Sequence, residues 1–243
     1  MRTSPIEQPD ALPVAPALWI YRRDSGSGLT DDEQPVEGPE EQRDDLRNEQ
    51  LIIRAVAHFS GTPTVEVVVA RHCRRCGGDD HGKPYVIAPR RDDGAPIQVS
   101  LSRAGGLVAV AVTSGPPIGF DIEDPSAIAH APIDAAALHP AEQAALLATP
   151  ESERDGIRAL LWSAKEAVLK ATGWGLVIDP TALELAIAAD GQLTLETWPI
   201  SLELDESPYL GVIEVPSVAD DRSLLGVIAV IGQRPSEIDL LRI

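Results

Sequence analysis

Apolar residues recur at helical spacing from Asp44 to Phe59, which predicts an amphipathic helix with one buried face. The apolar residues of this face are Leu46, Ile52, Ile53, Val56 and Phe59. Gly61-Thr62-Pro63 follows and predicts the end of the helix, because glycine and proline do not continue helical structure. The valine-rich segment from Thr64 to Ala70 then predicts a strand.

Three more strands are predicted in the middle of the chain. The polar, glycine-rich segment from Arg71 to Pro84 predicts a loop. The apolar segments that follow it predict strands from Ile97 to Ser102, from Gly106 to Thr113 and from Ile118 to Glu123. Ser114-Gly115-Pro116-Pro117 separates the last two strands and is the clearest break in this part of the chain.

The second half combines long helical segments with short strands. The segment from Asp134 to Ala148 has a helical pattern that His139-Pro140 interrupts, and a longer helix is predicted from Ser152 to Thr172, ending at Gly173. Short apolar stretches between turn residues then predict strands from Leu183 to Ile231. The predicted fold class is α+β, in which helices interrupt antiparallel strands without strict βαβ alternation.

Composition narrows the cellular setting of the chain. Of its 243 residues, 44% are hydrophobic, which is typical of a globular protein. No apolar run approaches the roughly 20 residues that span a bilayer. The segment from Met1 to Asp10 is polar and contains prolines, unlike a secretory signal. We therefore expect a cytoplasmic protein that does not contact membranes.

The net charge of -18 argues against nucleic acid as the main partner, because phosphate backbones are bound by basic surfaces. Much of the acidic excess lies between Asp24 and Asp45, together with several glycines and prolines. This composition predicts a solvated and partly flexible acidic loop.

Two carboxylates, Asp121 and Glu123, are two residues apart on a predicted strand. Successive side chains of a strand point to opposite faces, so these two point the same way while Ile122 points into the core. An acidic turn at the end of a strand is the more common explanation of such a pair, and the pair alone predicts no function.

Glu166 and Lys170 are four residues apart on the long predicted helix and share one face with Trp162. Alone they could form an ordinary surface ion pair worth about 0.2–0.5 kcal/mol. This part of the helix is apolar around most of its circumference, however, which predicts burial. A buried Lys-Glu-x-x-x-Lys cluster needs charged partners. Mg²⁺ held by Asp121, Glu123 and Glu166, together with a polyphosphate, would meet that need.

The order of these motifs resembles the 4'-phosphopantetheinyl transferase superfamily. The shared pattern is Ile118-Gly119-x-Asp121-x-Glu123 and, after about forty residues, Trp162-Ser163-x-Lys165-Glu166-Ala167-x-x-Lys170. Chain length places the resemblance with the large, surfactin-synthetase-activating type. It implies a monomer with two similar α+β halves, residues 43–116 and 117–243, after an N-terminal segment 1–42. The active site would lie in the cleft between the halves.

The resemblance also implies residues that bind coenzyme A. Lys83, in His81-Gly82-Lys83-Pro84, corresponds to a lysine that contacts the phosphates. Ser102-Arg103 stands where the family usually has Ser-His, and arginine preserves a cation that grips phosphate. Lys165 and Lys170 are further candidates. Arg47 is a candidate from the first helix, although Arg43 and Arg54 are alternatives.

The implied reaction transfers 4'-phosphopantetheine from coenzyme A to a serine of an acyl or peptidyl carrier protein and releases 3',5'-ADP. Mg²⁺ would be the cofactor, Glu166 its ligand, the general base or both, and Lys170 a catalytic residue. The synthase served could make fatty acids, polyketides or nonribosomal peptides. Two alternatives are a non-catalytic module that binds coenzyme A or carrier proteins, and a different Mg²⁺-dependent phosphohydrolase.

The only two cysteines, Cys73 and Cys76, have the spacing of a zinc half-site, and His72 and His81 lie nearby. The spacing to the histidines is tighter than in zinc fingers, so the sequence favours a reduced structural loop and leaves a zinc site as the alternative.

Overall fold

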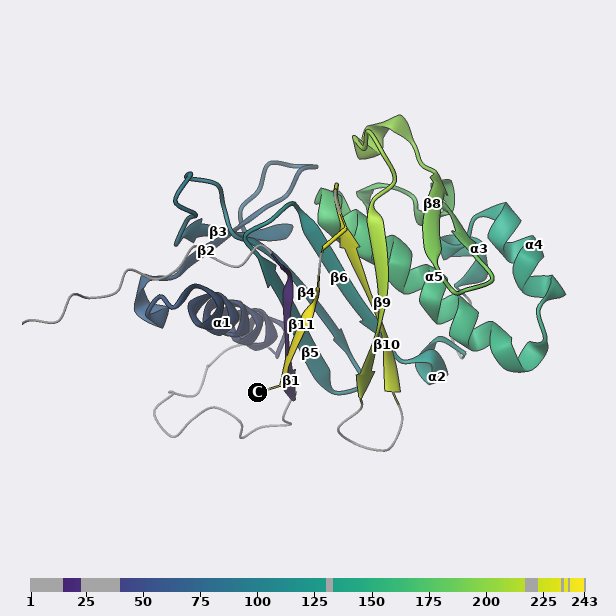
Figure 1. The fold of residues 1–243 in the computed structure, drawn as a ribbon, viewed down its shortest axis with the longest axis horizontal. Coiled ribbons are helices and arrows are strands. Elements are labelled where there is room, and N and C mark those ends of the chain that lie inside the picture. Colours follow the sequence, from purple (N-terminus) through teal and green to yellow (C-terminus); the bar gives the residue numbers. More distant parts are fainter. Residues whose placement is uncertain are drawn as a thin grey trace, which may run out of the picture.

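The computed structural model describes residues 15–22, 40–129, 133–216, 223–232, 234–235 and 237–242. Residues 24–39, which make up most of the predicted acidic loop, lie outside the described residues. Residues 1–14 of the predicted N-terminal segment also lie outside them. The architecture is α+β, as predicted, with two principal sheets side by side (Figure 1).

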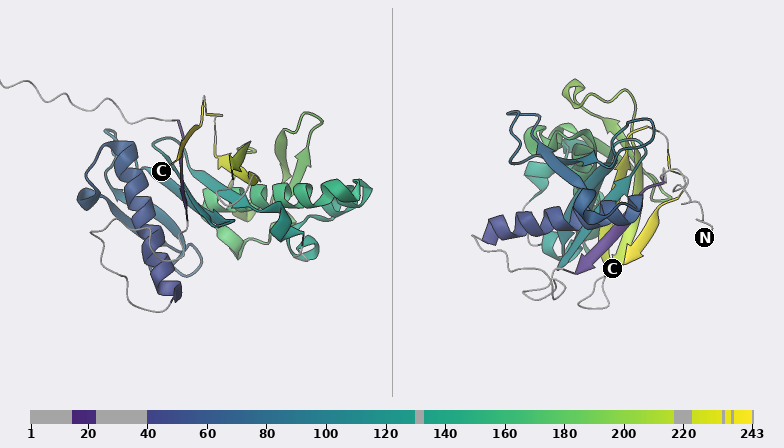
Figure 2. Two further views of the ribbon diagram at one scale, coloured as in Figure 1. Left: turned by 90° about the horizontal axis from the view of Figure 1, so that it is seen from below. Right: turned by 90° about the vertical axis from the view of Figure 1, so that its left-hand side faces the viewer.

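The first sheet has the strand order β11-β1-β5-β4, and β1 runs antiparallel to β5 and parallel to β11. Its strands are β1 (Ala17–Arg22), β4 (Gln98–Ala104), β5 (Leu107–Thr113) and β11 (Asp239–Arg242). Helix α1 (Glu40–Ser60) covers one face of this sheet (Figure 2). Ile52 and Val56 of the helix share a core with Trp19 of β1.

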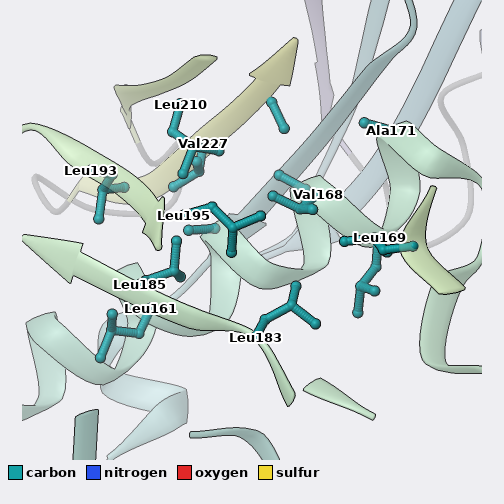
Figure 3. Packing of buried hydrophobic residues seen from close by; sticks show 14 of the residues in the cluster. Leu161, Val168, Leu169, Ala171, Leu183, Leu185, Leu193, Leu195, Leu210 and Val227 are labelled. Atoms are coloured by element: carbon teal, nitrogen blue, oxygen red, sulfur yellow. The ribbon is translucent and has the colours of Figure 1, made fainter. Parts of the chain in front are cut away.

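The second sheet has the strand order β6-β10-β9, all antiparallel. Its strands are β6 (Ile118–Glu123), β9 (Tyr209–Pro216) and β10 (Ser223–Val230). Helix α5 (Glu151–Thr172) packs on this sheet, and its apolar residues meet those of the hairpin β7 (Glu184–Ile187) and β8 (Leu193–Thr197) (Figure 3). Leu161, Val168 and Leu195 lie in this core.

Smaller elements lie between the principal helices and strands along the chain. The hairpin β2 (Val68–His72) and β3 (Lys83–Ala88) follows α1. Helices α2 (Pro125–Ile128), α3 (Asp134–Ala137) and α4 (Pro140–Ala148) precede α5. Short 3-10 helices are η1 (Thr64–Glu66), η2 (Gly175–Val177), η3 (Pro180–Ala182) and η4 (Ile200–Leu202). Among the described helices, none combines the length and hydropathy needed to cross a bilayer.

Two serines of β4 join the sheets at the edge of β6. Ser100 Oγ accepts a hydrogen bond from Phe120 N at 2.9 Å, and Ser102 Oγ accepts one from Ile122 N at 3.3 Å. Because β6 is an edge strand with β10 as its only neighbour in the described sheet, these hydroxyl groups accept hydrogen bonds from the N–H groups on its other side. The junction therefore brings β4 side chains directly against the carboxylates of β6.

Most of the predicted elements are confirmed, including the helix that ends at Gly173, whose φ of +78° suits glycine. The strand predicted from Thr64 is wrong in its first three residues, which form η1. Val65 is 90% exposed, so its side chain does not join a buried face as the valine pattern suggested. The loop predicted from Arg71 to Pro84 is wrong at both ends, because Arg71 and His72 lie in β2 and Lys83 and Pro84 lie in β3.

Gly119 allows α5 to pack directly on β6. A Cβ atom at this position would lie 1.9 Å from Ala167 O and 2.5 Å from Ala171 N of the helix. We expect Gly119→Ala to lower the free energy of unfolding by about 1–3 kcal/mol, because helix and strand must separate. Gly156→Ala is the matched control, since nothing lies within 4 Å of its added Cβ in the middle of α5. It should stabilise the protein by about 0.5–1 kcal/mol. Equal effects in urea unfolding would contradict this packing argument.

Candidate active site

A cleft of about 280 Å³ lies between the elements α1, β2, β3 and β4 on one side and the C-terminal end of α5 on the other. The first half contributes residues of α1, β2, β3 and β4, and the second contributes α5 and the turn after it. The charged residues that line the cleft are Arg71, Arg74, Lys83, Glu166 and Lys170. Four of these five are cationic, so the cleft is suited to an anionic ligand despite the acidic net charge of the chain.

Asp121 is the carboxylate at the centre of the junction, with a side chain only 5% exposed. Its Oδ1 accepts hydrogen bonds from Lys170 Nζ at 2.6 Å and from Ser102 Oγ at 2.7 Å. Its Oδ2 is buried and has no hydrogen-bond partner in the protein. Because a buried carboxylate oxygen without a partner is costly, Oδ2 is suited to a cation that a ligand brings.

Two more carboxylates lie near Asp121. Glu123 Oε1 accepts a hydrogen bond from Trp162 Nε1 at 2.9 Å. Burial, and then the negative charge of Asp121, raise the pKa of Glu123 to about 7. Burial also raises the pKa of Glu166, with a smaller contribution from Asp121 that Lys170 opposes. The three carboxylates therefore crowd negative charge into a poorly solvated region.

The three carboxylates fit a divalent cation in chemistry. Oxygen ligands are those that Mg²⁺ prefers, and a cation would relieve both the unpartnered Oδ2 of Asp121 and the raised pKa values of the two glutamates. Their nearest oxygens are not gathered within 4.8 Å of one another. The reason is that Asp121 is drawn to Lys170 and Glu123 to Trp162.

Lys83 lies in the cleft wall, between the two halves. Its Nζ donates to Ala171 O at 2.8 Å and to Ile118 O at 3.2 Å, so it links β3 to α5 and β6. Burial, and then the charge of Arg74, lower the pKa of Lys83 to about 8. A bound phosphate would favour the charged form of this lysine.

Lys165, a candidate for binding coenzyme A, lies in the core away from the cleft. Its side chain is 0% exposed, and Nζ donates to Glu142 Oε2 at 2.6 Å. It also donates to Ala137 O at 2.8 Å and to Pro180 O at 3.1 Å. These contacts tie α3, α4 and η3 to α5, so the structure assigns Lys165 a structural position.

Arg103 and Arg47 are not among the residues that line the cleft. Arg103 is exposed near the end of β4, and by strand alternation it shares a face with Leu101, which does line the cleft. Arg47 lies on α1, five residues before the cleft residue Ile52. Ser102 and Lys170, by contrast, meet directly, with Lys170 Nζ donating to Ser102 Oγ at 3.3 Å.

Three cleft residues were not predicted from the sequence. Arg71 and Arg74 flank the start of the loop between β2 and β3, and Trp174 follows the end of α5. The Arg74 guanidinium carbon lies 4.7 Å from the centre of the Trp174 ring, and Nη1 pairs with Glu203 at 3.0 Å. In the sequence, only the three arginines at the start of this loop, Arg71, Arg74 and Arg75, could have indicated a site that binds anions.

The raised pKa of Glu123 predicts a dependence of stability on pH. The folded protein holds this proton more tightly than the unfolded chain, so without a divalent cation stability should fall as pH rises from about 4.5 to about 7. After allowance for partial exposure we expect a loss of about 1–2 kcal/mol, which Glu123→Gln should remove. Urea unfolding in EDTA at pH 5 and pH 8 measures it.

Glu214→Gln is the matched control for this prediction, because Glu214 is exposed on β9 of the same sheet. The stability of Glu214→Gln should change with pH by the same amount as the stability of the parent protein. If Glu123→Gln also follows the parent, Glu123 does not carry the raised pKa.

Comparison with known proteins finds one family whose model matches part of the chain. Residues 117–212 match the family described as the 4'-phosphopantetheinyl transferase superfamily. No curated protein matches the chain significantly. Among solved structures, the acyl carrier protein synthase of Plasmodium yoelii with ADP bound is similar at 19% identity and a TM-score of 0.37, over 49% of this chain and 96% of that chain. The family match includes Asp121, Glu123, Glu166 and Lys170.

Proposed function

We propose that the chain is a member of the 4'-phosphopantetheinyl transferase superfamily, whose family model matches residues 117–212, and that it transfers 4'-phosphopantetheine from coenzyme A to a serine of an acyl or peptidyl carrier protein. One observation carries the proposal. The Lys170–Asp121–Ser102 contact and Glu166 lie together at a cleft whose other charged residues, Arg71, Arg74 and Lys83, are cations.

Coenzyme A presents a pyrophosphate and a 3'-phosphate, which suit the cationic side of the cleft. Arg71, Arg74 and Lys83 would hold these phosphates, and the exposed Arg103 would reach them from the end of β4. Arg74 would also offer its guanidinium plane, stacked on Trp174, to the ligand.

Asp121, Glu123 and Glu166 would hold Mg²⁺, and the Oδ2 atom of Asp121 is free to bind it because no group of the protein donates to this atom. When bound, Mg²⁺ supplies Lewis-acid stabilisation of the charge on pyrophosphate.

The residues of the chain would carry out the proton and charge transfers. The carrier serine hydroxyl would attack the β-phosphorus of coenzyme A, and its proton would pass to the Glu166 carboxylate, which lines the cleft and whose pKa is raised by burial. The bond from this phosphorus to the oxygen that bridges it to the α-phosphorus breaks, and 3',5'-ADP leaves with that oxygen. Lys170 would stabilise the leaving phosphate and hold Asp121 in position.

The carrier protein would dock beside the cleft on η2. Leu176 is 63% exposed and Val177 44% exposed, and Val177 lines the cleft. This apolar pair lets an acidic carrier approach an acidic protein without relying on charge attraction. The monomeric state, the cytoplasmic location and the synthase served stay predictions.

Incubation with an apo carrier domain, coenzyme A and Mg²⁺, followed by intact mass measurement of the carrier, tests the proposal. We expect the carrier mass to rise by one phosphopantetheine group, and to stay unchanged when its acceptor serine is replaced by alanine. An unchanged mass with fatty-acid, polyketide and peptide carriers alike would refute the proposed transfer.

The same reaction mixture separates the two alternatives. Release of 3',5'-ADP without any carrier would indicate a phosphohydrolase. Binding of coenzyme A by calorimetry, with neither release nor transfer, would indicate a binding module.

A further inference from the structure

The loop between β2 and β3 brings together Cys73, Cys76 and His81. One ligand atom from each of these residues lies within 4.8 Å of the others. In the part of the chain that the structure describes, this is the only group of three or more His, Cys, Asp or Glu residues with that property. The group is separate from the carboxylates of the proposed transferase site, although Cys73 lines the same cleft.

Backbone geometry explains why a ten-residue loop gathers these three side chains. The last ladder pair of the hairpin is His72 with Lys83, which places Cys73 at one foot of the loop and Gly82 at the other. A Cβ atom on Gly82 would lie 2.3 Å from His72 O, so only glycine lets the two feet approach this closely. His81 is thereby held beside Cys73.

A tight turn returns Cys76 to the same place. Gly77 N donates to Cys73 O at 2.8 Å, and Cys73 N donates to Gly78 O at 2.9 Å. Both sulfur atoms also accept backbone N–H groups, Cys76 from Gly78 at 3.4 Å and Cys73 from Arg75 and Cys76. Such donors stabilise thiolate, the form of cysteine that binds metals.

His81 is oriented as a metal ligand. Its Nδ1 lies 2.6 Å from Asp80 Oδ1, and its Nε2 faces Cys76 Sγ at 3.4 Å. A metal-binding histidine usually donates its other ring N–H to a carboxylate in this way. Zinc bond lengths and a tetrahedral angle separate a sulfur and a nitrogen ligand by about 3.6 Å. The observed distance is close to that value without any rearrangement.

We propose that this loop binds one Zn²⁺ through Cys73 Sγ, Cys76 Sγ and His81 Nε2, with water as the fourth ligand. Thiolate and imidazole suit zinc, whereas Mg²⁺ prefers oxygen, so the two metals would occupy separate sites. A disulfide between the cysteines would not require His81 and Asp80 to be aligned with them. The loop also bears Arg74 and leads directly into Lys83, so zinc would fix two cations of the cleft.

Metal analysis and cobalt substitution test the site. Protein purified without chelator under reducing conditions should contain about one zinc per chain. After removal of zinc, added Co²⁺ should give the near-ultraviolet absorption band of thiolate-to-cobalt charge transfer. Carboxylate ligands give no such band, so Asp121→Asn should retain it.

Cys76→Ser and His81→Asn are the test variants, and both positions are exposed, so folding should not depend on them. Cys76→Ser should lose the zinc and most of the cobalt band. His81→Asn should weaken zinc binding by more than the roughly 10–100-fold that is lost when an outer-shell partner is removed, because it removes a ligand. His72→Asn is the matched control, since His72 is exposed next to Cys73 but outside the group, and it should retain the zinc.

Two results would overturn the proposal. One is folded protein, kept under reducing conditions, that takes up neither zinc nor cobalt with a thiolate band, or whose cysteines are nevertheless recovered only as a disulfide. The other is a Cys76→Ser variant that holds zinc as the parent does. Neither result depends on transferase activity, so the zinc site and the proposed function can fail separately.

Discussion

Asp121→Asn should lower transfer of phosphopantetheine by at least about 100-fold, the size expected when a preorganised charge at a reacting centre is removed. Asparagine keeps the shape of the side chain and an oxygen that can accept from Lys170 and Ser102. It places an uncharged group at the position of Oδ2, the buried atom without a partner. Packing is therefore preserved while the carboxylate charge at the junction is lost. Initial rates with an apo carrier measure the change.

The control for this variant is Asp190→Asn, in the turn between β7 and β8. Asp190 is exposed and accepts a hydrogen bond from Gln192 N at 3.0 Å, which asparagine can also accept. It should transfer at the rate of the parent protein. Asp121→Asn should unfold at a lower urea concentration than Asp190→Asn, because Lys170 loses its charged partner, but both should be folded under the assay conditions. Transfer by Asp121→Asn within a few fold of the parent would place the metal elsewhere.

Lys165→Met should lower the free energy of unfolding by about 3–5 kcal/mol, because it leaves the buried carboxylate of Glu142 without its cation. For a chain of this size the melting temperature should fall by about 6–20 °C. Glu142 cannot move to water, since Oε1 accepts from Leu185 N and Oε2 from His139 N, both at 2.8 Å. Thermal unfolding measures the loss. Well below the melting temperature the variant should still transfer phosphopantetheine.

Two further variants test whether the loss of stability comes from the unpaired charge of Glu142 and whether it is specific to Lys165. Lys165→Met combined with Glu142→Gln should recover most of the stability, because no buried charge is then unpaired. Lys170→Met should instead abolish transfer at a smaller loss of stability, since the Lys170 side chain is 27% exposed. If Lys165→Met were stable but could not bind coenzyme A, Lys165 would line the cleft as the family resemblance implies.

The sequence determined the parts of this protein that depend on local patterns. The α5 helix and its end at Gly173 follow from helical spacing and a left-handed glycine, and β6 follows from a short apolar segment between turns. Strand alternation likewise places Asp121 and Glu123 on one side of β6. These properties are set by residues within a few positions of one another, which is why a pattern along the chain predicts them.

Tertiary structure decided which of these residues meet. Lys165 and Lys170 are five positions apart, so they point about 140° apart around the helix, and one enters the core while the other reaches Asp121. Their spacing alone cannot identify the one that faces the cleft, because this depends on how α5 rolls against β6. The same holds for β1 and β11, since β1 pairs with the distant β5 on one side and with β11, near the other end of the described chain, on the other side.

The loop of Cys73, Cys76 and His81 depends on both levels. The cysteine spacing is visible in the sequence, but the five residues to His81 look too short for a zinc site until the hairpin closes. Pairing of His72 with Lys83 and the contact of Gly82 with the backbone of β2 bring the histidine back to the cysteines. The sequence supplied the ligands, and the close approach of two backbone segments brought them together.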